Sequence, residues 1–210
     1  MTTYTDKKKR VVITGYGMIT PLGINAQETF QNCKEGKSGI DYIRSFDTSA
    51  LPCKIGGEVR DDCIDKGIAG KSAKYLSRGG LLFLHAIKEA YLMADLDSVK
   101  DRYRIGLSVG NHGDNPKIKD MNHLHRFFDG KDRWDLHSLD LNGGYNFLNF
   151  FKRKPDITST IAAHTFDARG SNIVIVSACA AGAQAIGEAY KTIIDGKADV
   201  FIAGGAESVT

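Results

Sequence analysis

One cysteine, Cys179, stands where a β-branched run gives way to a stretch rich in small residues. The run Asn172–Val176 predicts a buried strand, and the stretch Ala180–Ile194 predicts a helix. A thiol at the start of a helix lies near unpaired N–H groups and the positive end of the helix dipole, which favours the thiolate. A thiolate can accept an acyl group, because a thioester both forms and leaves readily. Cys179 is therefore the candidate nucleophile, and the competing interpretation is a buried structural cysteine.

Two further patterns resemble cofactor or metal motifs, and we interpret both as structural. The pattern Gly15-x-Gly17-x-x-Thr20 is half of a dinucleotide fingerprint, but the third glycine is replaced and no acidic ribose ligand follows. The pair His123-x-His125 has no clear third ligand, so surface histidines are the favoured interpretation. We expect neither a metal nor a bound cofactor.

Two basic clusters are the remaining candidates for a binding role. Lys71, Lys74 and Arg78 recur at helical spacing, and residues 152–154 are all basic. Most such runs are solvated faces, and docking of an acidic partner is the alternative.

The elements that must position Cys179 belong to an α/β fold. Four apolar, mainly β-branched segments predict strands, namely Val11–Thr14, Arg104–Val109, Asn172–Val176 and Ala198–Ala203. The last two flank the helix Ala180–Ile194, and strand, helix and strand at this spacing form a βαβ unit. We expect the four strands to share one mainly parallel sheet, with this helix buried on one face.

Further elements are predicted from local signals. Asn25 is a plausible cap for a short helix over Ala26–Lys34. Apolar and small residues at steps of three and four predict a helix within Ser72–Asp95. Residues 37–70 are irregular, with one or two short strands, and residues 111–155 form a long polar region rich in aromatic residues.

Composition indicates a packed globular protein. The 210 residues fit one domain, although two are possible, and 42% apolar with 25% charged residues is close to the globular average. A net charge of +3 falls short of the concentrated basic surface that binds nucleic acid. No apolar run is long enough to span a membrane. The four cysteines form no CxxC pair, which favours reduced thiols and a cytoplasmic location.

Three segments resemble the N-terminal half of β-ketoacyl-acyl-carrier-protein synthases, the ketosynthases of the thiolase superfamily. Val176–Ala189 is similar to the nucleophile segment, Asp195–Glu207 to the strand and loop that follow, and Arg10–Gly23 to the opening strand and turn. Weaker matches lie at residues 46–59 and 75–78, and all occur in the family's order. The resemblance covers about two-thirds of the chain and is closest to the type II synthases of fatty-acid and polyketide-type synthesis.

The resemblance implies a thiolase-like fold of two similar halves, each with a mainly parallel five-stranded sheet flanked by helices. Residues 1–210 would be the N-terminal ketosynthase domain, with the C-terminal half absent from the chain. Cys179 would take an acyl group from the phosphopantetheine of an acyl carrier protein, with its own backbone N–H as one oxyanion donor. A malonyl-carrier thioester would then lose carbon dioxide and attack the acyl-cysteine in a Claisen condensation. The implied partners are the carrier protein and either a second copy or a complementary C-terminal half.

Departures from the family limit what the resemblance implies. The family's two catalytic histidines, in HGT-type and GHxxGA-type motifs, and its lysine belong to the C-terminal half, and neither motif occurs here. The second oxyanion donor is missing as well, so we expect the chain alone to be incompetent for condensation. His112 falls near where the family usually has small residues after its strand, and the sequence gives no role for it. The alternatives are a thiolase-type acyl-CoA acyltransferase and a non-catalytic partner subunit, which commonly lacks the cysteine.

Overall fold

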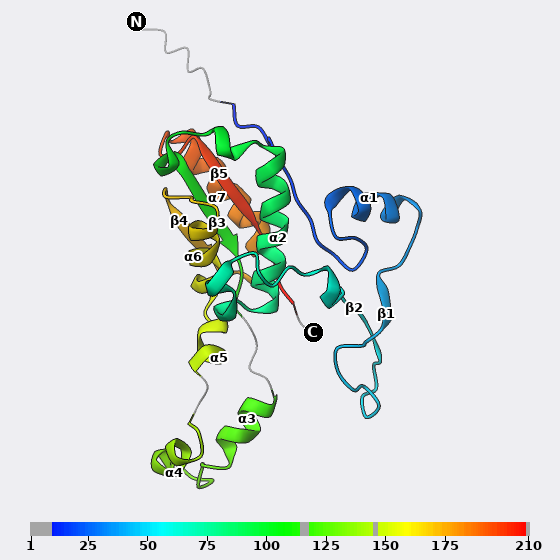
Figure 1. Cartoon of the computed structure of the whole chain (residues 1–210), viewed down its shortest axis with the longest axis vertical. Helices are drawn as coiled ribbons and strands as arrows, with labels where there is room; N and C mark the ends of the chain where they lie inside the picture. The colour runs from blue at the N-terminus through cyan, green and yellow to red at the C-terminus, as the bar shows by residue number, and fades with distance from the viewer. Residues whose placement is uncertain (1–9, 114–117, 145–146, 209–210) are drawn as a thin grey trace, which may run out of the picture.

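The computed structural model describes residues 10–113, 118–144 and 147–208 (Figure 1). In chain order its helices and strands are α1 (Ala26–Lys34), β1 (Ile40–Tyr42), β2 (Ile55–Gly57), α2 (Arg78–Met93), β3 (Ile105–Gly110), α3 (Ile118–His125), α4 (Leu136–Leu141), α5 (Phe147–Lys152), α6 (Pro155–Thr165), β4 (Asn172–Ile175), α7 (Ala181–Ile194) and β5 (Val200–Gly205). Short 3₁₀ turns connect several of them, including Gly70–Tyr75 and Ala178–Ala180.

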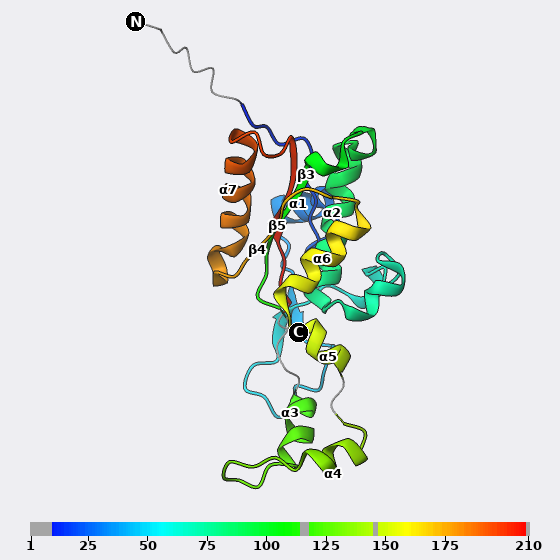
Figure 2. The same cartoon turned by 90° about the vertical axis from the view of Figure 1, so that its left-hand side faces the viewer.

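The main sheet has three parallel strands in the order β4-β3-β5 within the described residues. Helix α7 covers one face, while α2 and α6 lie on the other (Figure 2). The α/β class is confirmed, as is the expected sheet that joins β3, β4 and β5. The edge position of β4 is what brings the turn before α7 to the surface.

The central strand β3 is buried along its whole length. Ile105, Leu107 and Val109 are at most 1% exposed, as expected for a strand with both faces covered. From α2, Leu84 and Ile87 pack into the same core. A fully buried strand of this kind gives the carboxyl end of the sheet a rigid foundation.

The expected strand Val11–Thr14 is wrong, because this segment pairs with no strand in the described part of the chain. It runs extended past α2 (Figure 1), with the side chain of Ile13 84% exposed. A Cβ on Gly15 would lie 2.2 Å from the carbonyl oxygen of Ala90, so the segment touches α2 backbone to backbone. Among the described residues this sheet has three strands, rather than the five that the resemblance implies. A β-branched run has strand propensity, but pairing also needs a neighbouring edge within hydrogen-bond reach.

Several local expectations are confirmed or corrected. Asn25 caps α1, since its side chain accepts from the N–H of Glu28 at 2.8 Å. The helix expected within Ser72–Asp95 is confirmed as α2, which begins at Arg78 because the hydroxyl of Ser77 caps it by accepting from the N–H of Gly80 at 3.0 Å. The strands β1 and β2 pair antiparallel, as expected for residues 37–70.

The described part of residues 111–155 contains three short helices that the sequence did not predict. Helices α3 and α4 project beyond the end of the sheet, while α5 packs against α6 and the turn Gly70–Tyr75 (Figures 1 and 2). Because this region is polar and rich in aromatic residues, its sequence shows no clear spacing of apolar residues that would have predicted helices.

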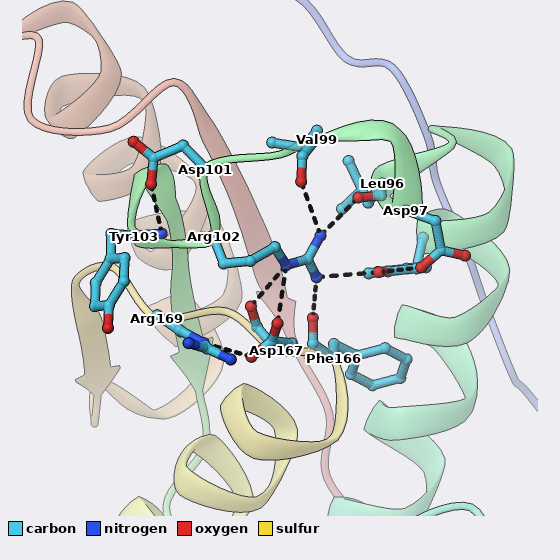
Figure 3. Close-up of polar contacts among 10 residues, drawn as sticks. Leu96, Asp97, Val99, Asp101, Arg102, Tyr103, Phe166, Asp167 and Arg169 are labelled. Carbon is cyan, nitrogen blue, oxygen red and sulfur yellow. Dashed lines mark hydrogen bonds and ion pairs between the residues drawn. The ribbon is translucent and has the colours of Figure 1, made fainter.

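Arg102, just before β3, ties three parts of the fold together (Figure 3). Its guanidinium donates to the carbonyl oxygens of Leu96 at 2.7 Å, Phe166 at 2.6 Å and Asp167 at 3.0 Å. It also donates to the hydroxyl of Tyr91 at 3.0 Å. These bonds join the end of α2, the end of α6 and the start of β3, and they satisfy carbonyl groups that helix ends leave unpaired.

No helix among the described residues is long and apolar enough to cross a membrane. All four cysteines, Cys33, Cys53, Cys63 and Cys179, are free thiols.

Candidate active site

Cys179 lies in the 3₁₀ turn Ala178–Ala180, between the edge strand β4 and helix α7. The turn is sharp, because Ala178 has a φ of 44°, in the left-handed region that residues with a side chain seldom adopt. Such a conformation costs roughly 1–2 kcal/mol, and strain of this kind gathers at functional sites. The turn leaves the side chain of Cys179 exposed rather than buried in the core. The interpretation of Cys179 as a buried structural cysteine is therefore wrong.

Two glycines allow α7 to start close against the strand ends. A Cβ on Gly110 would lie 2.5 Å from the carbonyl carbon of Ala181, and one on Gly205 would lie 3.1 Å from the Cα of Gly182. Backbone contact on both strands leaves the first turn of α7 little freedom to shift. The position of Cys179, which directly precedes this turn, follows from that contact.

A shallow cavity of about 250 Å³ opens at the carboxyl ends of the three strands. Its titratable side chains come from three segments: Cys179 from the turn before α7, His112 from beyond β3 and Glu207 from beyond β5. The carboxyl edge of a parallel sheet is where α/β folds place their ligand sites.

His112 and Glu207, which line the same cavity as Cys179, make a contact that the sequence did not predict. The Nδ1 atom of His112 lies 2.9 Å from the carboxylate oxygen Oε1 of Glu207. In the sheet, Gly110 on β3 is directly opposite Gly205 on β5, and each side chain follows its glycine by two residues. The strand register would have revealed the pair, but register is not visible in one sequence.

Asn111 anchors the segment that carries His112. Its side chain is 5% exposed, and its amide donates to the hydroxyl of Thr158 on α6 at 3.3 Å. Its backbone N–H donates to Ile175 of β4 at 3.1 Å, and its side-chain oxygen accepts from the N–H of Gly113. A buried, fully engaged asparagine therefore fixes the loop at the mouth of the cavity.

The other sequence candidates lie elsewhere. His123 stands on α3, with its ring against that of Phe127 at 5.4 Å, and His125 ends the same helix. No cluster of three or more His, Cys, Asp or Glu side chains that could hold a metal ion occurs among the described residues. Gly15 and Gly17 pack against α2, so their spacing is explained by helix contact.

The sequence of the chain matches one protein family. Residues 8–210 match the family model described as "Beta-ketoacyl synthase, N-terminal domain". A match over nearly the whole chain means that this protein belongs to the β-ketoacyl synthase family.

Individual relatives agree with the family match. A 3-oxoacyl-[acyl-carrier-protein] synthase 2 from Synechocystis sp. (strain ATCC 27184 / PCC 6803 / Kazusa) is 32% identical, over 96% of this chain and 46% of its own length. The crystal structure of a β-ketoacyl synthase from Burkholderia phymatum STM815 has a TM-score of 0.74 at 24% identity, covering 96% of this chain and 48% of that one. A type II polyketide synthase acyl-carrier protein in complex with its ketosynthase bound to the hexaketide has a TM-score of 0.67 at 24% identity, covering 96% and 46%.

These similarities confirm the thiolase-like ketosynthase fold expected from the sequence. The chain spans about half the length of the curated relatives it matches.

Proposed function

We propose that this chain is the nucleophile-bearing part of a β-ketoacyl-acyl-carrier-protein synthase in fatty-acid or polyketide-type synthesis. The observation that carries the proposal is the position of Cys179: exposed, in a strained turn ahead of α7, on the wall of a cavity at the carboxyl edge of the sheet. A thiol held in this way can meet a thioester that arrives from solvent. Membership of the family supports the same role.

The reaction we propose begins when the sulfur of Cys179 attacks the carbonyl carbon of an acyl thioester on phosphopantetheine. The amide of Cys179 stands in the first turn ahead of α7, whose N–H groups have no partner within the helix, and it donates to the developing oxyanion. The carbon–sulfur bond to pantetheine breaks, and the acyl group remains on Cys179. Decarboxylation of a malonyl thioester and attack by its carbanion then extend the chain, with the family's histidine motifs supplied from outside these 210 residues.

Mass spectrometry of the Cys179 peptide tests this assignment. We expect a mass increase equal to the acyl group after incubation with an acyl-carrier thioester, and none in Cys179→Ala. Cys33→Ala is the matched control, since it removes another exposed thiol and should leave acylation unchanged. Absence of the acyl group from the Cys179 peptide would refute the proposal.

The same experiment separates the alternative activity. A thiolase-type acyltransferase would take its acyl group from coenzyme A in preference to the carrier protein. Faster acylation by acyl-coenzyme A than by the acyl-carrier would favour that activity. A non-catalytic partner subunit is the remaining alternative, and the presence of Cys179 counts against it.

A surface of four lysines is the candidate docking site for the carrier protein. We call it the basic surface, and its members are Lys71, Lys74, Lys152 and Lys154. It is assembled from two distant segments, because the turn Gly70–Tyr75 packs against α5 with the rings of Tyr75 and Phe151 5.8 Å apart. Arg78 does not belong to it, since its guanidinium is bound to Asp61 and to the carbonyl of Val59.

The basic surface is connected to the cavity that contains Cys179. A Cβ on Gly113, next to His112, would lie 2.0 Å from the carbonyl oxygen of Arg153, so the two regions adjoin. Family carrier proteins are acidic, and complementary charge guides such partners to the correct orientation. These observations support acyl carrier protein as the partner that delivers the substrate.

Charge reversal tests the docking role. We expect Lys74→Glu to raise the carrier concentration needed for half-maximal acylation of Cys179 several-fold at low salt. The difference should shrink at about 1 M salt, where the Debye length is roughly 3 Å. Lys100→Glu is the control, because Lys100 is exposed in the loop that enters β3, at the opposite end of the sheet. Equal effects of the two substitutions would contradict a local docking site.

A second polypeptide is the other partner that we propose, and the outer face of α7 is the surface that it would cover. The outer face of α7 carries Ile186, Tyr190 and Ile194, which are 56%, 53% and 36% exposed and recur every four residues. An apolar stripe of this kind is covered in most soluble assemblies. The relatives are about twice as long as this chain, so we propose that a complementary ketosynthase half covers the stripe. We also propose a cytoplasmic location, in line with the four free thiols.

A further inference from the structure

The contacting side chains of His112 and Glu207 face the same cavity as Cys179, and the imidazole ring supplies the site with a proton acceptor of its own. The side chains of His112 and Glu207 are 40% and 44% exposed, so substrate and solvent can reach them. Apart from these two and Cys179, the lining consists of small or neutral residues. Any proton that leaves the thiol inside the cavity therefore has His112 and Glu207 as its nearby titratable acceptors.

The contacts of His112 decide which of its ring nitrogens accepts a proton. Nδ1 lies 2.9 Å from the carboxylate of Glu207 and 2.8 Å from the carbonyl oxygen of Gly113. Both neighbours only accept hydrogen bonds, so Nδ1 carries the proton in the neutral ring. The second nitrogen, Nε2, is then unprotonated and basic. The contact with Glu207 holds the ring in this orientation.

We propose that His112 is the proton carrier for acylation of Cys179, with Glu207 as its positioning residue. Nε2 of His112 takes the thiol proton of Cys179, directly or through one water, as the sulfur attacks the acyl carbonyl. The bond from sulfur to the acyl carbon forms, and the bond from that carbon to the pantetheine sulfur breaks. His112 then gives the same proton to the departing pantetheine sulfur, so the products are the acyl-cysteine and a free thiol, with no net gain or loss of protons.

This inference rests on the proposed function, because it takes Cys179 to be the acyl acceptor. It adds a residue that the resemblance does not supply, since His112 falls near where the family usually has small residues. The family's two motif histidines act on the malonyl unit in the later condensation. His112 would act earlier, on the acyl transfer itself.

Two thioesters with different leaving groups test the proton transfer. An alkyl thiolate such as that of pantetheine is a poor leaving group and needs a proton, whereas an aryl thiolate leaves without one. We expect His112→Gln to slow acylation of Cys179 by acyl-pantetheine about a hundredfold. Acylation by the S-phenyl thioester of the same acyl group should slow far less, so the ratio of the two rates should change at least about tenfold. Glu207→Gln should shift the ratio in the same direction by a smaller factor.

The controls and contrary outcomes separate this inference from the proposed function. His164→Gln removes another exposed histidine, at the end of α6, and should leave both rates unchanged. Thermal unfolding of each variant shows whether the fold is retained, and Glu207→Gln provides a second test that keeps the imidazole. Equal slowing with both donors, or no slowing, would overturn the role of His112 while Cys179 remained the acyl acceptor. Failure of the unsubstituted chain to be acylated by either donor would overturn the proposed function and this inference together.

Discussion

Gly110 and Ala181 touch backbone to backbone, since a Cβ on Gly110 would lie 2.5 Å from the carbonyl carbon of Ala181. The contact joins the end of the central strand β3 to the first turn of α7. Cys179 stands two residues before Ala181, so the closeness of strand and helix determines where the thiol is held.

Gly110→Ala should therefore displace the nucleophile. The added methyl group clashes with backbone atoms, which cannot move aside by changing a side-chain rotamer. We therefore expect the free energy of unfolding to fall by about 1–3 kcal/mol. Acylation of Cys179 should fall by more than the stability loss explains. Gly187→Ala is the matched control, because a Cβ there meets nothing within 4 Å and alanine favours the helix by up to about 1 kcal/mol. Similar unfolding curves and acylation rates for the two variants would show that the contact is unimportant.

Arg102 should be among the most important polar residues for stability. Arg102→Leu removes the guanidinium donor from the carbonyl groups of Leu96, Phe166 and Asp167, and we expect the free energy of unfolding to fall by about 3 kcal/mol. The carbonyl of Leu96 keeps a second donor, the N–H of Val99 at 3.3 Å. Chemical denaturation measures this change. Arg169→Ala is the control, since Arg169 makes an exposed ion pair with the same aspartate and should have little effect. An equal loss of unfolding free energy in Arg169→Ala would mean that the bonds from Arg102 to the carbonyl groups do not account for the effect of Arg102→Leu.

Cys179 should be the thiol most readily alkylated. Cys33 and Cys53 are also exposed and Cys63 is half-buried, so exposure alone does not distinguish Cys179. Its place ahead of the α7 N-terminus, beside His112, is what favours attack. Limiting iodoacetamide followed by peptide mapping gives the four rates in one experiment. Labelling of Cys179 that is no faster than that of Cys33 would count against an activated nucleophile.

The strand β4 should be covered by a second copy of the chain. It lies at an edge of the sheet, within the described residues, and an uncovered apolar edge invites aggregation. The carbonyl of Ser171 accepts from Leu107 of β3, and that of Ile175 accepts from Asn111, just after β3. The alternation of a parallel ladder therefore points the N–H of Val174 outward.

Val174→Pro should therefore remove an outward donor and weaken a dimer without breaking the ladder to β3. Light scattering should report a dimer for the unsubstituted chain and a smaller species for this variant. Val174→Ala, which keeps the N–H, should remain dimeric. A stable monomer from the unsubstituted chain would contradict the expected pairing.

The chain of 210 residues should not catalyse condensation by itself. Decarboxylation leaves negative charge on a thioester oxygen, and none of the six histidines stands in the family's HGT-type or GHxxGA-type motif. Loss of one such donor costs about two to three orders of magnitude in rate. Carbon–carbon bond formation from acyl-carrier and malonyl-carrier should appear only when a complementary ketosynthase half is added. Full turnover by the chain alone would mean that histidines outside those motifs, such as His112, perform the step.

Local patterns in the sequence were enough to predict the elements that meet at Cys179. Each of the three elements is recognisable from its own residues: β4 from its β-branched run, α7 from its alanine-rich stretch and β5 from its apolar run. Their order, strand, helix and strand, implies a parallel sheet. The cap of α1 at Asn25 is equally local, because an asparagine side chain reaches an N–H only three residues away.

Only the tertiary structure decided which segments pair and which side chains meet. Val11–Thr14 has the composition of a strand, yet its neighbouring glycines dock it against α2, and it pairs with no strand among the described residues. His112 and Glu207 are 95 residues apart in the chain and meet because β3 and β5 lie in register. Register depends on how whole strands pack against shared helices, so it is a property of the assembled core rather than of any short stretch of sequence.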